Sequence, residues 1–149
     1  MAGLSYRNNS MTEYLFVYGT LRSEFPHPLA KRLSTQAKFV GMGSAPGLLY
    51  DFGWYPGAKF DPDARTHVIG EVFWLKNAER LLAELDHYEG TAEPGHAFRR
   101  VPVKVRLERG RTVDAWSYEI GDSKARRRPI ESGDFIHHRR LKDQKPVRD

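Results

Sequence analysis

Alternating apolar and polar positions predict β-strands along much of this chain. In residues 98–107 the alternation is clean, with arginine and lysine on one face and, on the other face, Val101, Val103, Val105 and Leu107. Residues 14–18 and 113–118 are short runs rich in aromatic and β-branched side chains, and residues 68–75 are largely apolar on both faces. Such runs are typical of strands, and apolar residues on both faces suit a closed or covered sheet. We therefore expect these four segments to form one curled sheet or barrel.

Turn-forming residues interrupt the pattern that follows the first strand. Residues 39–44 and residues 48–50 have strand-like composition, and Pro46 and Gly47 lie between them. Because a Pro-Gly pair commonly marks a turn, we expect two separate short strands here.

Two segments in the first two thirds of the chain have helical spacing. Leu29 and Leu33 are four residues apart, which predicts a short helix. Residues 78–88 carry an apolar stripe at helical spacing, with Asn77 as the candidate N-cap. We expect Gly90 to end this helix, since glycine is common just after a helix.

Near the end of the chain, Ser132 is the candidate cap of a last short helix through residues 137–138. The expected strands gather around one central helix and do not alternate regularly with helices. This arrangement favours the α+β class, with a small barrel or a strongly curled sheet.

The composition bounds the kind of protein. A length of 149 residues with 40% hydrophobic residues is enough for one domain with a real core. The chain has no cysteine, which excludes disulfides, thiolate metal sites and cysteine nucleophiles. No run approaches the roughly 20 apolar residues of a membrane span, and the N-terminus has no apolar signal region. We therefore expect a cytoplasmic protein that does not interact with membranes.

The positive charge is concentrated near the C-terminus. The net charge of the chain is +5, of which residues 121–149 contribute +4, from nine Lys and Arg against five Asp and Glu. We expect a flexible N-terminal tail over residues 1–13, one domain over residues 14–135 and a basic tail over residues 136–149. A nucleic-acid-binding barrel that works through this tail is one alternative, but the nearly neutral body gives it no support.

Common catalytic motifs are missing from the sequence. It contains no P-loop, no G-x-S-x-G and no H-E-x-x-H, and no two of its six histidines are four residues apart. The sequence therefore predicts no metal site of that type.

The turn after the first strand is the first candidate site. Gly19 follows Tyr18 where the predicted strand ends, and Thr20 and Leu21 follow. Consecutive backbone N–H groups at such a turn can bind a carboxylate or a developing oxyanion, and glycine permits close approach. An ordinary strand-to-helix turn explains the same residues equally well.

The acidic residues near the end of the predicted central helix are the second candidate. Asp86 and Glu89 lie there, near the negative end of the helix dipole, which destabilises each negative charge by roughly 0.3–1 kcal/mol. A surface chosen for stability alone would more often carry lysine or arginine at this position. One of the two carboxylates could serve as a general base, although a solvated helix end is the alternative.

These segments together resemble the γ-glutamylcyclotransferase-like superfamily, which includes the γ-glutamylamine cyclotransferases and the AIG2-like proteins. The resemblance begins at F-V-Y-G-T-L-R (residues 16–22) and continues through Y-P-G-A (55–58) and V-I-G-E-V-F (68–73). It extends through L-D-H-Y-E-G (85–90) and F-R-R-V (98–101) to S-G-D-F (132–135). Residue 98 is phenylalanine where many members have tyrosine.

The resemblance implies a small mixed β-barrel with flanking short helices and a substrate pocket. It implies that Glu89 is the catalytic base and that Tyr18, Gly19, Thr20 and Leu21 bind the substrate. We expect Tyr118, together with Trp116, to form an aromatic wall of this pocket. Glu89 is expected to lie close to the loop of residues 18–21.

The implied reaction is an intramolecular acyl transfer. The substrate's own α-amine attacks its γ-carbonyl, which releases an amine or amino acid and forms 5-oxoproline. A five-membered ring closure needs mainly orientation and proton transfer, so we expect no cofactor and no metal. The expected partner is a small γ-glutamyl substrate. The main alternative is a non-catalytic protein that binds an amino-acid-like ligand on the same barrel.

Overall fold

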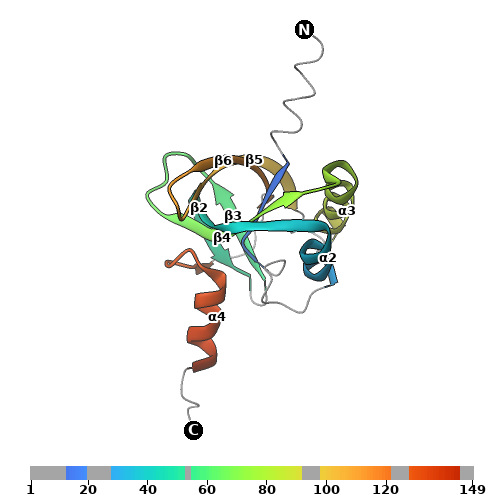
Figure 1. Ribbon diagram of the computed structural model, residues 1–149. Coiled ribbons are helices and arrows are strands. Elements are labelled where there is room, and N and C mark those ends of the chain that lie inside the picture. Colours follow the sequence, from blue (N-terminus) through green and yellow to red (C-terminus); the bar gives the residue numbers. More distant parts are fainter. Residues whose placement is uncertain (1–12, 20–27, 53–54, 92–97, 122–127, 145–149) are drawn as a thin grey trace.

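The computed structural model describes residues 13–19, 28–52, 55–91, 98–121 and 128–144 (Figure 1). Its strands are β1 (Tyr14–Val17), β2 (Ala37–Asp51), β3 (Pro56–Phe60), β4 (His67–Leu75), β5 (Phe98–Leu107), β6 (Thr112–Ile120) and β7 (Arg128–Pro129). Its helices are α2 (Pro28–Gln36), α3 (Ala78–Thr91) and α4 (Phe135–Gln144). All four segments that the alternation pattern assigned to strands are strands, so this part of the prediction is confirmed.

Five strands close into a mixed barrel. Their order is β2-β4-β1-β6-β5, and β5 pairs again with β2. β1 runs parallel to β6, whereas the other neighbouring pairs are antiparallel. The closing seam consists of the pairs Gly43–Leu107 and Ser44–Arg106. Gly43 is needed there, because a Cβ atom at this position would lie 2.7 Å from Val105 Cγ1. The expected α+β class with a small mixed barrel is confirmed.

The prediction of two short strands around Pro46 and Gly47 is wrong, because β2 continues through both residues. Pro46 ends the pairing with β4, opposite His67, and Gly47 begins the pairing with β3, opposite Phe60. A Cβ atom at Gly47 would lie 2.6 Å from the carbonyl oxygen of Lys59. The Pro-Gly pair therefore marks a change of partner strand and not a chain reversal.

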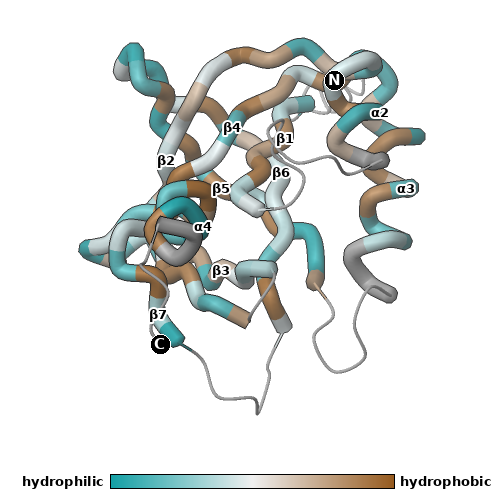
Figure 2. The backbone as a smooth tube through the Cα atoms, turned by 90° about the horizontal axis from the view of Figure 1, so that it is seen from below, coloured by the Kyte–Doolittle hydropathy of each residue, from teal (hydrophilic) through white to brown (hydrophobic). Residues whose placement is uncertain are grey.

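The strands bury side chains on both faces. Inside the barrel a core includes Phe16, Tyr18 and Val72, and outside it a second core includes Leu15, Val17 and residues of α2 and α3. Successive residues of β1 therefore enter different cores, which explains why this strand is apolar throughout. In Figure 2, α2 and α3 lie along one side of the barrel and α4 lies on the opposite side.

Helix α3 begins where the sequence predicted but continues to Thr91. The prediction that Gly90 ends it is wrong. A glycine costs a helix only about 1 kcal/mol relative to alanine, so by itself it does not end a helix. Within the described ranges, no helix is long and apolar enough to cross a membrane.

Helix α4 is capped by Asp134 and not by Ser132. The Asp134 Oδ1 atom accepts hydrogen bonds from the backbone N–H groups of Ile136 (3.1 Å) and His137 (3.2 Å), as an N-cap residue does. The Ser132 hydroxyl instead contacts the backbone of Asp134. The prediction failed because both residues are good caps and only the backbone geometry selects one.

The first turns of α4 contact the barrel. Ile136 is buried, and His138 Nε2 lies 2.8 Å from Asp51 Oδ2 at the end of β2. The helix therefore occupies residues that the sequence assigned to the beginning of a basic tail.

Candidate functional site

The end of β1 is fixed to two other strands by one buried hydroxyl group. The Tyr18 hydroxyl donates a hydrogen bond to the Tyr118 carbonyl oxygen (2.6 Å) and accepts one from the Ala58 N–H group (3.1 Å). Tyr118 belongs to β6 and Ala58 to β3, and the Tyr18 side chain is buried inside the barrel. The hydroxyl thus fixes the position from which the glycine turn begins.

Gly19 packs closely against β3. A Cβ atom at this position would lie 2.9 Å from Pro56 Cγ and 3.0 Å from Pro56 Cδ. The missing side chain therefore lets the backbone pass next to the beginning of β3. Thr20 and Leu21, the other candidate residues of this turn, lie outside the described residues.

Helix α3 is connected to the same region through Tyr118. The Tyr118 hydroxyl donates a hydrogen bond to Asp86 Oδ1 at 2.7 Å, while its backbone carbonyl receives the Tyr18 hydroxyl. Asp86 Oδ1 also lies 3.0 Å from Arg100 Nε in an ion pair. Arg100 is directly opposite Tyr118 in the β5–β6 pairing, so both side chains stand on the face that α3 covers. One residue of β6 thus joins the helix to the glycine turn.

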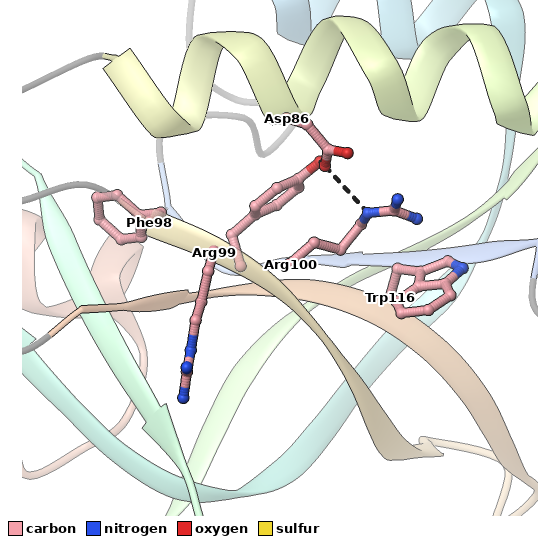
Figure 3. A pocket seen from close by; sticks show the side chains of 6 residues that line it. Asp86, Phe98, Arg99, Arg100 and Trp116 are labelled. Atoms are coloured by element: carbon pink, nitrogen blue, oxygen red, sulfur yellow. Dashed lines mark hydrogen bonds and ion pairs between the residues drawn. The ribbon is translucent and has the colours of Figure 1, made fainter.

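A cavity of about 430 Å³ lies beside this group. Figure 3 shows the side chains that line it. Its volume is in the range of small-molecule sites. The residues that line it are Asp86, Phe98, Arg99, Arg100, Trp116 and Tyr118. The two aromatic residues that were expected to form a wall of the pocket, Trp116 and Tyr118, both line this cavity.

Glu89 follows Asp86 by three residues in α3. Residues three apart share one face of a helix, so position 89 lies on the face that Asp86 turns toward Tyr118. The side chain of Glu89 lies outside the described residues, and its expected closeness to the loop of residues 18–21 stays a prediction.

A second cavity, of about 730 Å³, lies where β2 and β5 separate beyond their closing seam. Phe60 and Val101 are among its apolar lining residues, and Glu119 is its buried carboxylate. This carboxylate already accepts a hydrogen bond from the Phe60 N–H group (3.0 Å) and lies 3.3 Å from the Arg99 guanidinium. Among the candidates whose side chains the structure describes, none lines this cavity, whereas Tyr118 lines the smaller one, so we place the candidate site at the smaller cavity.

Sequence reasoning missed Arg100 and did not predict the ring contacts beside the site. The Tyr55 ring is stacked on Phe52 with centroids 5.5 Å apart, and it meets Phe98 edge-on at 6.3 Å. No periodic signal could reveal the contact between Tyr55 and Phe98, since it depends on how the residue before β3 meets the first residue of β5 in space.

Known proteins are similar to this chain over most of its length. A family model described as gamma-glutamyl cyclotransferase, AIG2-like, matches residues 15–137. A protein from Methanocaldococcus jannaschii, named as a candidate gamma-glutamylcyclotransferase, is 30% identical over 129 residues, which cover 85% of this chain and 98% of the relative. The range that the family model matches includes both the turn at residues 18–21 and the helix end at residues 86–89.

Two solved structures extend the comparison. An uncharacterized protein from Pyrococcus horikoshii is 28% identical with a TM-score of 0.63, over 89% of this chain and 97% of that one. An AIG2-like protein from Mus musculus is 27% identical with a TM-score of 0.61, over 76% of this chain and 79% of that one. The similarity therefore extends over most of the barrel.

Proposed function

Because the chain belongs to the AIG2-like γ-glutamyl cyclotransferase family, we propose that it cyclises the γ-glutamyl group of a γ-glutamyl amine or peptide. The products are 5-oxoproline and the released amine. The bond between the γ-carbonyl carbon and the leaving nitrogen breaks, and a bond between the same carbon and the substrate's α-nitrogen forms. Counted from the α-ammonium form of the substrate, two protons leave the α-nitrogen and two are taken up by the leaving nitrogen, so the amine is released as an ammonium ion and the reaction consumes no water.

Glu89 is the general base of this proposal. Its carboxylate takes one proton from the α-ammonium group, which makes the amine nucleophilic, and returns that proton to the leaving nitrogen. The second proton leaves the α-nitrogen after the attack and is taken up by the released amine. General acid–base groups of this kind typically contribute about 10²–10⁴-fold in rate. The support from the fold is the position of residue 89, one helical turn beyond Asp86 on the face that meets Tyr118.

The glycine turn is the anion-binding part of the proposal. Backbone N–H groups of Gly19, Thr20 and Leu21 bind the substrate's α-carboxylate and the oxyanion of the tetrahedral intermediate. Tyr18 positions this turn through its two buried hydrogen bonds, and Tyr118 forms a wall of the pocket. Holding the amine and the carbonyl in attack geometry supplies most of the remaining rate enhancement, because ring closure is intramolecular.

One observation carries the proposal. Tyr118 receives the Tyr18 hydroxyl on its carbonyl and donates its own hydroxyl to Asp86. Two segments about 70 residues apart in the sequence are thereby joined through one residue beside a cavity of about 430 Å³. A base on one segment and an anion site on the other need this kind of proximity.

The direct test is to incubate the purified protein with a mixed library of γ-glutamyl compounds and to detect 5-oxoproline by mass spectrometry. We expect 5-oxoproline together with an equal amount of one or more free amines. Binding of library members without any 5-oxoproline would instead support a non-catalytic binding protein.

The variant Glu89→Gln tests the base. It is nearly isosteric, so we expect an unchanged fold and a loss of at least about 100-fold in kcat, because an amide cannot accept the ammonium proton. Asp86→Asn is the matched control in the same helix. Its amide oxygen still accepts the Tyr118 hydrogen bond, so we expect only a few-fold effect. A Glu89→Gln protein with near-normal turnover would refute the assignment of the base.

A further inference from the structure

The Arg100 guanidinium is held on two sides before any ligand binds. Its Nε atom lies 3.0 Å from Asp86 Oδ1, and its Cζ atom lies 4.4 Å from the centroid of the Trp116 ring. Asp86 is itself fixed by the Tyr118 hydroxyl at 2.7 Å. An arginine fixed in this way loses less conformational entropy when it binds a ligand.

The terminal nitrogens of Arg100 remain available. A guanidinium has five N–H donors, and the Asp86 carboxylate lies next to Nε, so it does not occupy the four donors of the two terminal nitrogens. Within the part of the chain that the structure describes, the contacts of Arg100 are this ion pair and the Trp116 ring, and no acceptor binds its terminal nitrogens. Figure 3 shows the guanidinium extending beyond Asp86 above Trp116. The side chain is 28% exposed and lines the cavity.

The neighbouring arginine lines the same cavity but differs in direction, exposure and partner. Arg99 points away from Asp86 in Figure 3, is 72% exposed and lies 3.3 Å from Glu119. Of the two arginines in the described lining of the cavity, Arg100 is therefore the one that a residue of α3, Asp86, holds in place.

We propose that Arg100 is an anion subsite that binds a carboxylate on the leaving part of the substrate. The free edge of a guanidinium matches a carboxylate in geometry and can bind both of its oxygens. This inference rests on the proposed function, in which the α-carboxylate of the glutamyl group is bound at the Gly19 turn. The carboxylate at Arg100 then belongs to the leaving amine. The preferred substrate is a γ-glutamyl amino acid or peptide with a free carboxylate, and not a simple γ-glutamyl amine.

Two probes that differ in one group test the subsite. They are γ-L-glutamyl-L-alanine and the same compound with its alanine carboxylate converted to the amide. With the wild-type protein we expect the KM of the acid to be at least about 10-fold lower than that of the amide. The reason is that hydrogen bonds between a guanidinium and a charged carboxylate are stronger than those to a neutral amide. Calorimetric titration of the same two compounds gives their Kd values if no turnover occurs.

Variants identify the residue responsible. Arg100→Gln should raise the KM or Kd of the acid to that of the amide and leave the amide within about twofold. Arg100→Lys keeps a charge beside Asp86 but not the planar fork, so it should lose most of the preference while disturbing the fold less. Lys104→Gln, on the exposed face of β5, is the control for loss of one surface charge.

The outcomes separate this inference from the proposed function. Turnover of both probes with equal KM, or a preference that survives Arg100→Gln, overturns the subsite and leaves the cyclisation proposal intact. Preferential binding of the acid that depends on Arg100, without any 5-oxoproline, supports the subsite and overturns the cyclisation. If neither probe binds, the subsite is overturned together with its premise.

Discussion

Removal of the Tyr18 hydroxyl should destabilise the barrel by much more than removal of one exposed hydroxyl. Tyr18→Phe leaves the Ala58 N–H group and the Tyr118 carbonyl without the partner that each now has at 3.1 Å and 2.6 Å. A buried donor that loses its partner costs about 1–3 kcal/mol, and a carbonyl, which has a second lone pair, costs less. We therefore expect a loss of about 2–4 kcal/mol in the free energy of unfolding.

Tyr14→Phe is the matched control, because it removes the same atom from a tyrosine at the start of β1, the strand that Tyr18 directly follows. Within the described residues no hydrogen bond involves the Tyr14 hydroxyl, and its ring packs against the same core as Tyr18. We expect this variant to remain within about 0.5 kcal/mol of the wild type. Both tyrosines pack against the same core, Tyr14 half-buried and Tyr18 buried, and of the two only the Tyr18 hydroxyl makes the buried hydrogen bonds that the variant removes.

Urea unfolding followed by circular dichroism measures the difference. The slope m should be the same in all three proteins, so that the midpoints report stability directly. For a chain of this length, about 2–4 kcal/mol corresponds to roughly 5–15 °C in Tm. A Tyr18→Phe protein within about 0.5 kcal/mol of Tyr14→Phe would show that the buried hydroxyl does not hold the three strands together.

Two glycine positions give further predictions. Gly19→Ala should reduce turnover more than stability, because the new Cβ atom would lie 2.9 Å from Pro56 Cγ and must push the turn away from β3. Measurements of kcat and Tm on the same preparation check this expectation, and an unchanged kcat would contradict it. Gly133→Ala should prevent folding or cost well over ~2 kcal/mol, since its φ is 71° and a Cβ atom would collide with the His67 carbonyl oxygen. Gly110→Ala is the control, because Gly110 also has a positive φ, of 92°, but a Cβ atom there would meet no other atom within 4 Å. Urea unfolding should show a loss of only about 1 kcal/mol in its free energy of unfolding. Equal losses for Gly133→Ala and Gly110→Ala would show that the collision is unimportant.

The sequence alone was enough for most of the strands and for the fold class. Alternation in β5 and the apolar runs of β1, β4 and β6 depend on which face of each strand is buried, and this is a local property with a period of two residues. The same local pattern could not reveal that β2 continues through Pro46 and Gly47. That outcome depends on β3 and β4 both pairing with β2, which no single segment encodes.

The helix ends show the same division. The beginning of α3 was predicted from Asn77 and the apolar stripe, whereas its continuation past Gly90 was not. A cap residue is a preference of about 1 kcal/mol, and tertiary packing can override a preference of that size. The choice of Asp134 over Ser132 as the cap of α4 was decided in the same way, by backbone geometry.

At the candidate site, the sequence identified two segments and the family, and the tertiary structure decided how they meet. Tyr18 and Asp86 could each be singled out from their own neighbours in the chain. Their connection through Tyr118, and the position of Arg100 beside it, could not. A hydrogen bond between residues 32 or 100 positions apart depends on the closure of the barrel, and closure is a property of all five strands together. Local patterns therefore encode the elements and their buried faces, whereas contacts between distant residues arise only when the elements are assembled.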